Sequence, residues 1–330
     1  MNMLMIQRGR QQKGFVAIVV AGMLIVLMAL ITVGFTRLVQ REQRQVLDRQ
    51  LSRQALYAAE SGINDVYANL DSLKEEQTTC VGDPANGGVA ATTLNPEGTI
   101  EYTCVLFDKT PSELTYQISK EKSKLGILQT QNVGVKFSTI NLRWGVEDAK
   151  NNNPLNNCDE FPASHGGAPV IRLDITDMSD LSRSGLTGNT DSLYLKPCSA
   201  GTQTYAFGTG NKGKIVKVAK NGSGSQPYSL SINVGGVSDQ FLVRMATLYS
   251  PASVTIDAVD SSGNQVGFIN AQTVIDVTAR SSDVTRRLRA TVPLTDPDGL
   301  PEAVVQVFNG FCKQYTVSGN SVSDSCAASP

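Results

Sequence analysis

The sequence is poor in the side chains on which most catalytic and metal sites depend. It has one histidine, His165, and one tryptophan, Trp144, in 330 residues. A single histidine cannot build a multi-histidine zinc site, and no serine stands in the Gly-x-Ser-x-Gly pattern of a hydrolase. The cysteines include no Cys-x-x-Cys pair. We therefore expect neither an enzyme activity nor a bound cofactor.

Proline and charge are also missing from long stretches. No proline precedes Pro84, and the 21 residues from Phe15 to Phe35 carry no charge. As a helix this apolar run spans about 30 Å, enough to cross a bilayer. The basic leader, residues 1–14, is too hydrophilic for a secretory signal, and no small-x-small cleavage site follows the run. We expect one helix from Phe15 to Leu73, about 90 Å long.

Beyond the apolar run, this helix is predicted to be amphipathic. Small and apolar residues recur every three or four positions, at Leu47, Leu51, Ala55, Ala58, Gly62, Val66, Leu70 and Leu73. The opposite face is rich in Arg, Gln, Glu and Asp. The spacing contains no strict heptad, which disfavours a generic coiled-coil anchor.

Charge is distributed unevenly along the chain. Residues 1–54 contain eight basic and two acidic residues, a net charge of +6, whereas the whole chain has a net charge of −1 and residues 55–330 therefore −7. This mildly acidic remainder does not indicate a nucleic-acid surface. Basic residues lie on both sides of the apolar run, so the positive-inside rule does not settle its orientation.

Six cysteines lie beyond the apolar run and indicate on which side of the membrane the rest of the chain lies. An even number of widely spaced cysteines in an exported chain indicates disulfides in an oxidising compartment; the alternative is six buried thiols. Six cysteines allow 15 pairings. The simplest joins sequence neighbours: Cys80–Cys104, Cys158–Cys198 and Cys312–Cys326.

Two motifs make the N-terminal part resemble a type IV prepilin. The first is Lys13-Gly14-Phe15 directly before the apolar run. In that family a prepilin peptidase cuts between Gly and Phe, here Gly14 and Phe15, and the new N-terminal Phe15 is N-methylated. The second motif, AxYAAESG, is similar to that of minor pilins of the PilX type and includes Tyr57, Ala58, Ala59, Glu60, Ser61 and Gly62. The resemblance covers about residues 7–70.

The resemblance implies an architecture and a set of partners. It predicts an α+β fold: a prepilin leader (1–14), a transmembrane and stalk helix of the pilin type (15–74) and an extracytoplasmic head (75–330) of mostly antiparallel strands. The implied partners are other pilin subunits, the prepilin peptidase, the pilus assembly platform, membrane lipid and a target on a surface or host cell. The subunit would cross the cytoplasmic membrane once, with its head outside, and then enter a pilus at the cell surface.

One departure from the family pattern bears on function. Most pilins have Glu at the fifth mature position, read as pairing with the free amine of a neighbouring subunit, whereas this chain has Val19. Within the family, this absence is associated with minor pilins and with the K-type pseudopilins of type II secretion. A minor pilin acting in assembly, adhesion or motility is therefore the first interpretation. A K-like pseudopilin and a single-span, membrane-anchored binding protein or enzyme are the alternatives.

The head is predicted to be rich in strands. Turn-forming residues 77–98 mark its start, and apolar residues alternate with polar ones around Val133–Phe137, Phe241–Met245, Val254–Ala258 and Leu288–Val292. The stretch 213–293 could form one antiparallel sheet, with a hairpin turn at 261–264.

Two further motifs are interpreted as structural. Residues 208–213 match Gly-x-Gly-x-x-Gly, but a strand pattern follows where a dinucleotide site requires a helix, so we expect a hairpin turn. Acidic residues at Asp174, Asp177 and Asp180, and at 296–298, could offer oxygen ligands to calcium but match no EF-hand loop, which favours solvated acids. The aromatic residues Tyr102, Phe137, Trp144 and Phe241 are expected in the core.

Overall fold

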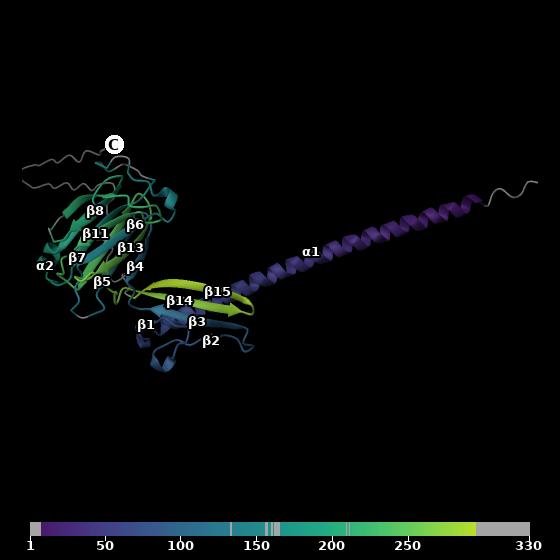
Figure 1. Ribbon diagram of the computed structural model, residues 1–330, viewed down its shortest axis with the longest axis horizontal. Coiled ribbons are helices and arrows are strands. Elements are labelled where there is room, and N and C mark those ends of the chain that lie inside the picture. Colours follow the sequence, from purple (N-terminus) through teal and green to yellow (C-terminus); the bar gives the residue numbers. More distant parts are fainter. Residues whose placement is uncertain are drawn as a thin grey trace, which may run out of the picture. The chain divides into compact units, whose positions relative to one another are not determined.

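The fold is α+β, with one long N-terminal helix followed by mostly antiparallel strands, as the sequence predicts. The computed structural model in Figure 1 describes residues 8–132, 134–155, 158, 159, 161, 166–208, 210 and 212–294. Contacts within the described chain divide it into two compact units. Unit 1 contains residues 8–73, 79–106 and 276–289, and unit 2 contains residues 74–78, 107–275 and 290–294.

The N-terminal helix, α1, runs from Arg8 to Ala68 and is 61 residues long. It contains no proline, so every turn can keep its backbone hydrogen bonds. It ends five residues before Leu73, where the prediction had placed its end. At Asn69 the backbone leaves the helix, and the side-chain amide of Asn69 donates to the carbonyl of Asp65 over 2.8 Å. A single 3-10 turn, η1, follows at Leu70–Ser72.

Among the helices of the described chain, α1 is the one that is long and apolar enough to cross a membrane. Two threonine hydroxyls at the end of the apolar run have partners within the helix. Thr32 donates to the carbonyl of Met28 and Thr36 to that of Thr32, each over 2.8 Å. Hydroxyl groups bonded within their own helix in this way would also be satisfied in a hydrocarbon environment.

The rest of the described chain forms short helices and 15 strands. The helical segments are η2 (Pro84–Asn86), η3 (Ala149–Asn151) and α2 (Arg183–Gly188). The strands are β1 (Glu76–Gln77), β2 (Thr92–Thr93), β3 (Ile100–Asp108), β4 (Glu113–Ile118), β5 (Ser123–Gln129), β6 (Thr139–Gly145), β7 (Val170–Asp177), β8 (Thr190–Cys198), β9 (Thr204–Ala206), β10 (Lys212–Ala219), β11 (Tyr228–Asn233), β12 (Gln240–Leu248), β13 (Ala252–Val259), β14 (Gln272–Ser281) and β15 (Val284–Pro293).

These strands form three five-stranded sheets. One has the order β1-β3-β14-β15, with β2 paired to β3, and in unit 1 it packs against the C-terminal part of α1 (Figure 1). The other two, β10-β8-β7-β12-β5 and β4-β13-β6-β11-β9, belong to unit 2. Most pairs are antiparallel, but β10 pairs with β8 and β9 with β11 in parallel.

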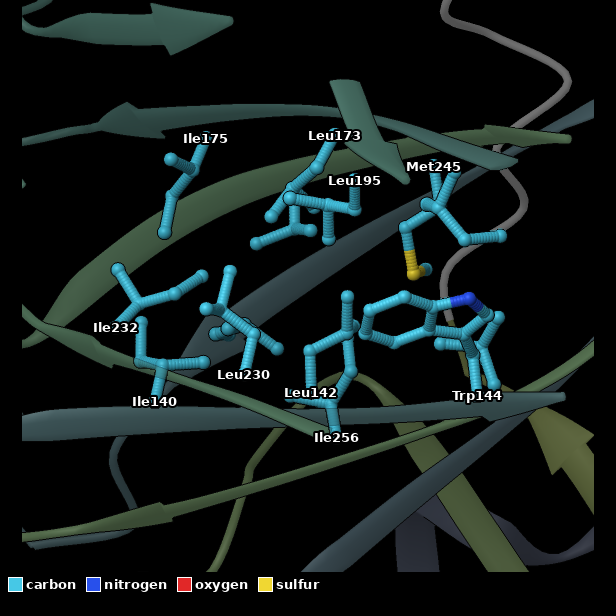
Figure 2. Close-up of a cluster of buried hydrophobic side chains, with 14 of the residues drawn as sticks. Ile140, Leu142, Trp144, Leu173, Ile175, Leu195, Leu230, Ile232, Met245 and Ile256 are labelled. Carbon is cyan, nitrogen blue, oxygen red and sulfur yellow. The ribbon is translucent and has the colours of Figure 1, made fainter. Parts of the chain in front are cut away.

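The two sheets of unit 2 pack face to face as a β-sandwich. Figure 2 shows the side chains of Leu173, Leu195 and Met245 from one sheet turned toward Leu142 and Trp144 from the other. Burial alternates along most of β6 and β12, because successive side chains of a strand point to opposite faces and only one face of each sheet meets the other sheet. The apolar alternation in the sequence is therefore the pattern of a sandwich interior.

Two expectations about the strands are wrong. The strand predicted around Val133–Phe137 is not found, because residues 134–138 form a loop before β6. Phe137 is nevertheless fully buried, and its ring stacks on that of Phe268 with the ring centroids 5.9 Å apart. The stretch 213–293 does not form one sheet, because its strands are distributed over all three. Period-two patterning identifies a strand but does not identify the partner beside which that strand lies. The hairpin turn at 261–264 is present, with Val259 bridged to Gln265.

A buried amide organises the loops at one end of the sandwich. Asn152 is 1% exposed. Its Nδ2 donates to the carbonyls of Val146, Gly224 and Ser225 over 3.0–3.2 Å, and its Oδ1 accepts from the backbone of Val146 over 2.8 Å. One side chain thus satisfies backbone groups from segments more than 70 residues apart in sequence.

We predict that Asn152→Ala lowers the free energy of unfolding by about 2–4 kcal/mol, because several buried backbone groups lose their partner at once. Urea unfolding of the full chain in detergent, monitored by tryptophan fluorescence, measures the change. Asn151→Ala is the matched control: among the described residues its side-chain amide bonds only the exposed side chain of Asp148, so a change of about 0.5 kcal/mol or less is expected. Equal effects of the two substitutions on the free energy of unfolding would show that the hydrogen bonds of Asn152 do not stabilise the fold.

Candidate functional site

The positions that the family resemblance singles out lie along α1. Gly14 and Phe15 fall within its backbone span, and the Phe15 side chain is not among the side chains that the structure describes. Val19 is 43% exposed, and every residue from Ala17 to Gln50 is exposed. The apolar surface of this part therefore has no partner within the described chain, which agrees with a segment that crosses a membrane.

The second motif divides between two faces of the helix. Ala58 and Ala59 are 1% and 0% exposed, and Gly62 is buried, whereas Tyr57 is 65% exposed and Glu60 lies in solvent. Ser61 is half-buried. The small residues of the motif are thus packing residues on the sheet side of α1, and its tyrosine and glutamate form part of an outer surface.

Gly62 is the point of closest approach between α1 and the sheet of unit 1. A Cβ atom at Gly62 would lie 2.8 Å from Val277 Cγ1 and 3.3 Å from the ring of Tyr102. Real Cβ atoms do not approach other carbons so closely, so a residue without a side chain is required here. The glycine of the motif therefore has a steric explanation.

A buried tyrosine fixes the same contact from the side of the sheet. Tyr102 on β3 is 3% exposed, and its hydroxyl donates to Asp65 Oδ2 over 2.8 Å. Burial, reinforced by the bond to the Asp65 carboxylate, raises the pKa of Tyr102 above its ordinary value. The hydroxyl consequently stays protonated and remains a donor throughout the neutral range. Asp65, Tyr102 and Thr92 line an open hollow of about 390 Å³.

Two further polar contacts join α1 to the β14–β15 hairpin. Ser281 Oγ donates to Gln54 Oε1 over 3.0 Å, and Arg286 donates to Ser52 Oγ over 2.9 and 2.6 Å. Beside this contact, Asp48, Arg49, Arg53 and Arg286 line an open hollow of about 320 Å³. Neither the hairpin nor its pairing with the helix follows from sequence patterning, since its residues lie more than 220 positions from the helix.

Two of the three expected disulfides are present. Cys80 is bonded to Cys104 within unit 1, and Cys158 to Cys198 within unit 2. The bonded cysteines are 24 and 40 residues apart in sequence. A disulfide that closes a loop of this length typically raises the free energy of unfolding by roughly 2–4 kcal/mol, because it restricts the unfolded chain. Cys312 and Cys326 lie outside the described residues. The neighbour pairing is therefore correct for both bonds within the described residues.

The remaining motifs have no binding geometry among the described residues. The glycine-rich segment at 208–213 connects β9 and β10, which belong to different sheets, so the expected hairpin turn is wrong; the strand after it is present. Asp174 pairs with Arg172 and Arg244, whereas Asp177 accepts from Ser179. The described chain contains no group of three metal-binding side chains. His165 and residues 296–298 lie outside it.

The four aromatic residues expected in the core are buried. Phe137, Trp144 and Phe241 are 0% exposed, and Tyr102 is 3% exposed. Trp144 also donates its indole N–H to the carbonyl of Pro169 over 3.1 Å, as a buried indole must.

Comparisons with known proteins identify no relative. No protein-family model matches the chain, and no curated protein sequence matches it significantly. A solved structure described as complete manganese lipoxygenase of Gaeumannomyces graminis with part of zonadhesin of Komagataella pastoris is 12% identical over 64% of this chain and 68% of that one, with a TM-score of 0.15.

We predict that Gly62→Ala destabilises unit 1 by about 1–3 kcal/mol, because the added methyl group overlaps Val277 and Tyr102. Thermal unfolding of the full chain in detergent measures this loss of stability. Gly34→Ala is the matched control within the same helix: nothing lies within 4 Å of its Cβ position, so the substitution should be neutral or slightly stabilising.

Adding Val277→Ala to Gly62→Ala makes room for the methyl group and should recover part of the lost stability. If Gly62→Ala unfolds like Gly34→Ala, close packing is not the reason for a glycine at this position.

Proposed function

We propose that this protein is a minor pilin subunit of a type IV pilus-like filament, acting in pilus assembly, surface adhesion or motility. The observation that carries the proposal is the pair of motifs on one helix: Lys13-Gly14-Phe15 before the uncharged run, and the Tyr57–Gly62 motif on the part that packs against a sheet. Gly14–Phe15 is then the bond that the prepilin peptidase cuts, and Phe15 the residue that is methylated.

The mechanism of such a subunit is assembly. The apolar half of α1 stores the subunit as a single span of the cytoplasmic membrane, and then packs among like helices. Apolar surface gains little by moving from lipid to another apolar helix, so close packing and polar contacts must drive association. The disulfides support a head exposed to an oxidising compartment outside the cytoplasm. The partners are then other pilin subunits, the assembly platform and a surface target of the head.

A K-like minor pseudopilin of a type II secretion system is the second candidate, and Val19 favours it. After cleavage, the charged amine of Phe15 would lie in an apolar environment. Another copy of this chain could not neutralise it, because Val19 stands where most pilins have Glu, and an unpaired charge there is costly. A neighbour that has the Glu could supply the partner. Both candidates therefore place the chain in mixed or terminal positions.

We predict cleavage between Gly14 and Phe15 by a prepilin peptidase, with methylation of the new terminus. Mass spectrometry of the mature N-terminal peptide in cells with and without the peptidase checks this. Gly14→Arg should leave the precursor intact, whereas the matched leader substitution Gly9→Arg should be processed. An uncut wild-type chain in cells that have an active peptidase would overturn the family assignment.

We also predict that the chain is a small fraction of any filament that contains it, and that it forms no filaments when expressed without other pilins. Quantitative mass spectrometry of sheared filaments measures its share relative to the most abundant subunit. Its appearance as the dominant subunit would rule out the minor-pilin interpretation and leave cleavage at Gly14 unaffected.

A further inference from the structure

Three arginines that closely follow the apolar run of α1 share one face of the helix. Arg37, Arg41 and Arg44 are separated by four and three residues. At 100° per residue they therefore fall within about 60° of one another around the helix axis. All three are exposed. We call this set the arginine stripe.

The charges of the arginine stripe are not neutralised within the described chain. Its members make no ion pair and no side-chain hydrogen bond with a residue that the structure describes, Asp48 included, although Asp48 follows Arg44 by four positions. Five arginines on the strands do pair with carboxylates: Arg143, Arg172, Arg244, Arg280 and Arg287. Since like charges three and four residues apart repel each other on a helix, an anion from another molecule would stabilise the stripe.

The stripe lies at the level of the headgroups of a bilayer that α1 crosses. Phe35 ends the uncharged run, and Leu38 and Val39, 53% and 45% exposed, continue the apolar surface beside Arg37. At 1.5 Å per residue, the three arginines lie roughly 3, 9 and 13 Å beyond Phe35 along the axis. The polar layer of each leaflet is about 5–7 Å thick. The stripe therefore begins inside this layer and ends a short distance beyond it.

The direction of side chains on a helix shortens that distance. Every Cα–Cβ bond of an α-helix tilts toward the N-terminus, and long side chains follow this direction. The N-terminal half of α1 is the half that can cross the membrane. The guanidinium groups of Arg41 and Arg44 thus lean back toward the headgroups, while their aliphatic stems cover the helix surface.

We propose that the arginine stripe binds the phosphate groups of acidic phospholipids, in the leaflet on the side of the β-rich head. The inference rests on the membrane span in the proposed function and deepens it by naming the lipid chemistry. A guanidinium group matches a phosphate with two parallel hydrogen bonds. An acidic lipid such as phosphatidylglycerol is preferred to phosphatidylcholine, because choline carries a positive charge that the stripe repels.

Two further arginines of α1 have the same charge but a different height. Arg49 and Arg53 lie roughly 21 and 27 Å beyond Phe35, and a helix tilt of about 20° lowers these heights by only about 6%. They line the hollow beside Arg286 and are out of reach of the headgroups. They therefore provide a matched control for the stripe.

The contact would have two consequences for the subunit. A stripe on one side of a helix reaches most headgroups when the helix leans toward that side, so the lipid contact sets the direction of tilt. In the proposed function, entry into a filament removes α1 from lipid and breaks the contact. Acidic lipid would then hold the unassembled subunit in the membrane.

Photo-cross-linking of the full chain in phosphatidylcholine vesicles tests the contact. The vesicles contain a trace of a probe lipid with a photoactivatable group beside the phosphate, and the probe is either a phosphatidylglycerol or a phosphatidylcholine. Each arginine near an acidic lipid contributes an attraction that corresponds to about a fivefold enrichment. We therefore expect the phosphatidylglycerol probe to label the wild-type chain at least about tenfold more than the other. Equal labelling by the two probes would overturn the proposal.

Substitutions assign the lipid preference to residues. The triple variant Arg37→Gln, Arg41→Gln and Arg44→Gln should bring the labelling ratio below about two, because the attraction to the acidic headgroup is lost. The control variant Arg49→Gln with Arg53→Gln should keep the wild-type ratio. An unchanged ratio in the triple variant, or an equal loss in the control, would overturn the assignment to the stripe.

A soluble anion separates a lipid contact from a general phosphate site. Glycerol phosphate at about 10 mM should leave the labelling unchanged, because confinement to the bilayer gives the lipid a far higher effective concentration. Displacement of the lipid probe by glycerol phosphate would show a site that does not depend on the membrane, and would overturn the proposal.

The outcomes for the stripe and for the proposed function are distinguishable. Cleavage at Gly14 without a preference for the acidic probe would overturn the lipid contact and keep the pilin assignment. A preference that depends on the stripe, in a chain that is never cleaved, would support the contact on an ordinary membrane anchor and overturn the proposed function.

Discussion

The close contact of α1 with the sheet of unit 1 is the constraint on which the rest of that unit depends. A glycine and two alanines on one face of the helix let β3 and β14 approach it closely enough for Tyr102 and Val277 to contact the helix at Gly62. Tyr102 then reaches Asp65, and Ser281 and Arg286 reach Gln54 and Ser52. Without small residues on this face, the helix would be held at a distance at which none of these bonds could form.

This contact divides the helix into parts with different roles. The apolar run has no partner in the described chain, whereas the C-terminal part buries one face on the sheet and presents the other to solvent. The same residues, Tyr57 to Gly62, contribute to both faces. A single motif can thus combine residues that pack against the sheet with residues exposed to solvent, because the spacing of residues along a helix decides which face each of them occupies.

Sequence patterning was most successful where one physical rule acts alone. The uncharged, proline-free run predicts α1, alternation predicts β12 and β13, and proximity in sequence predicts Cys80–Cys104 and Cys158–Cys198. It was wrong where long-range packing decides. Phe137 has the alternation of a strand, yet it lies in a loop whose burial comes from Phe241 and Phe268. The segment 208–213 resembles a hairpin but crosses between sheets.

The sequence by itself determined the long helix, its apolar part that is long enough to cross a membrane, the β-rich remainder and the two motifs that resemble those of a pilin subunit. Each of these depends on local spacing or composition, which a chain carries before it folds. The tertiary structure alone decided which strands share a sheet, why residue 62 must be glycine, and which hairpin contacts α1. These depend on contacts between residues as much as 234 positions apart, which no local pattern encodes.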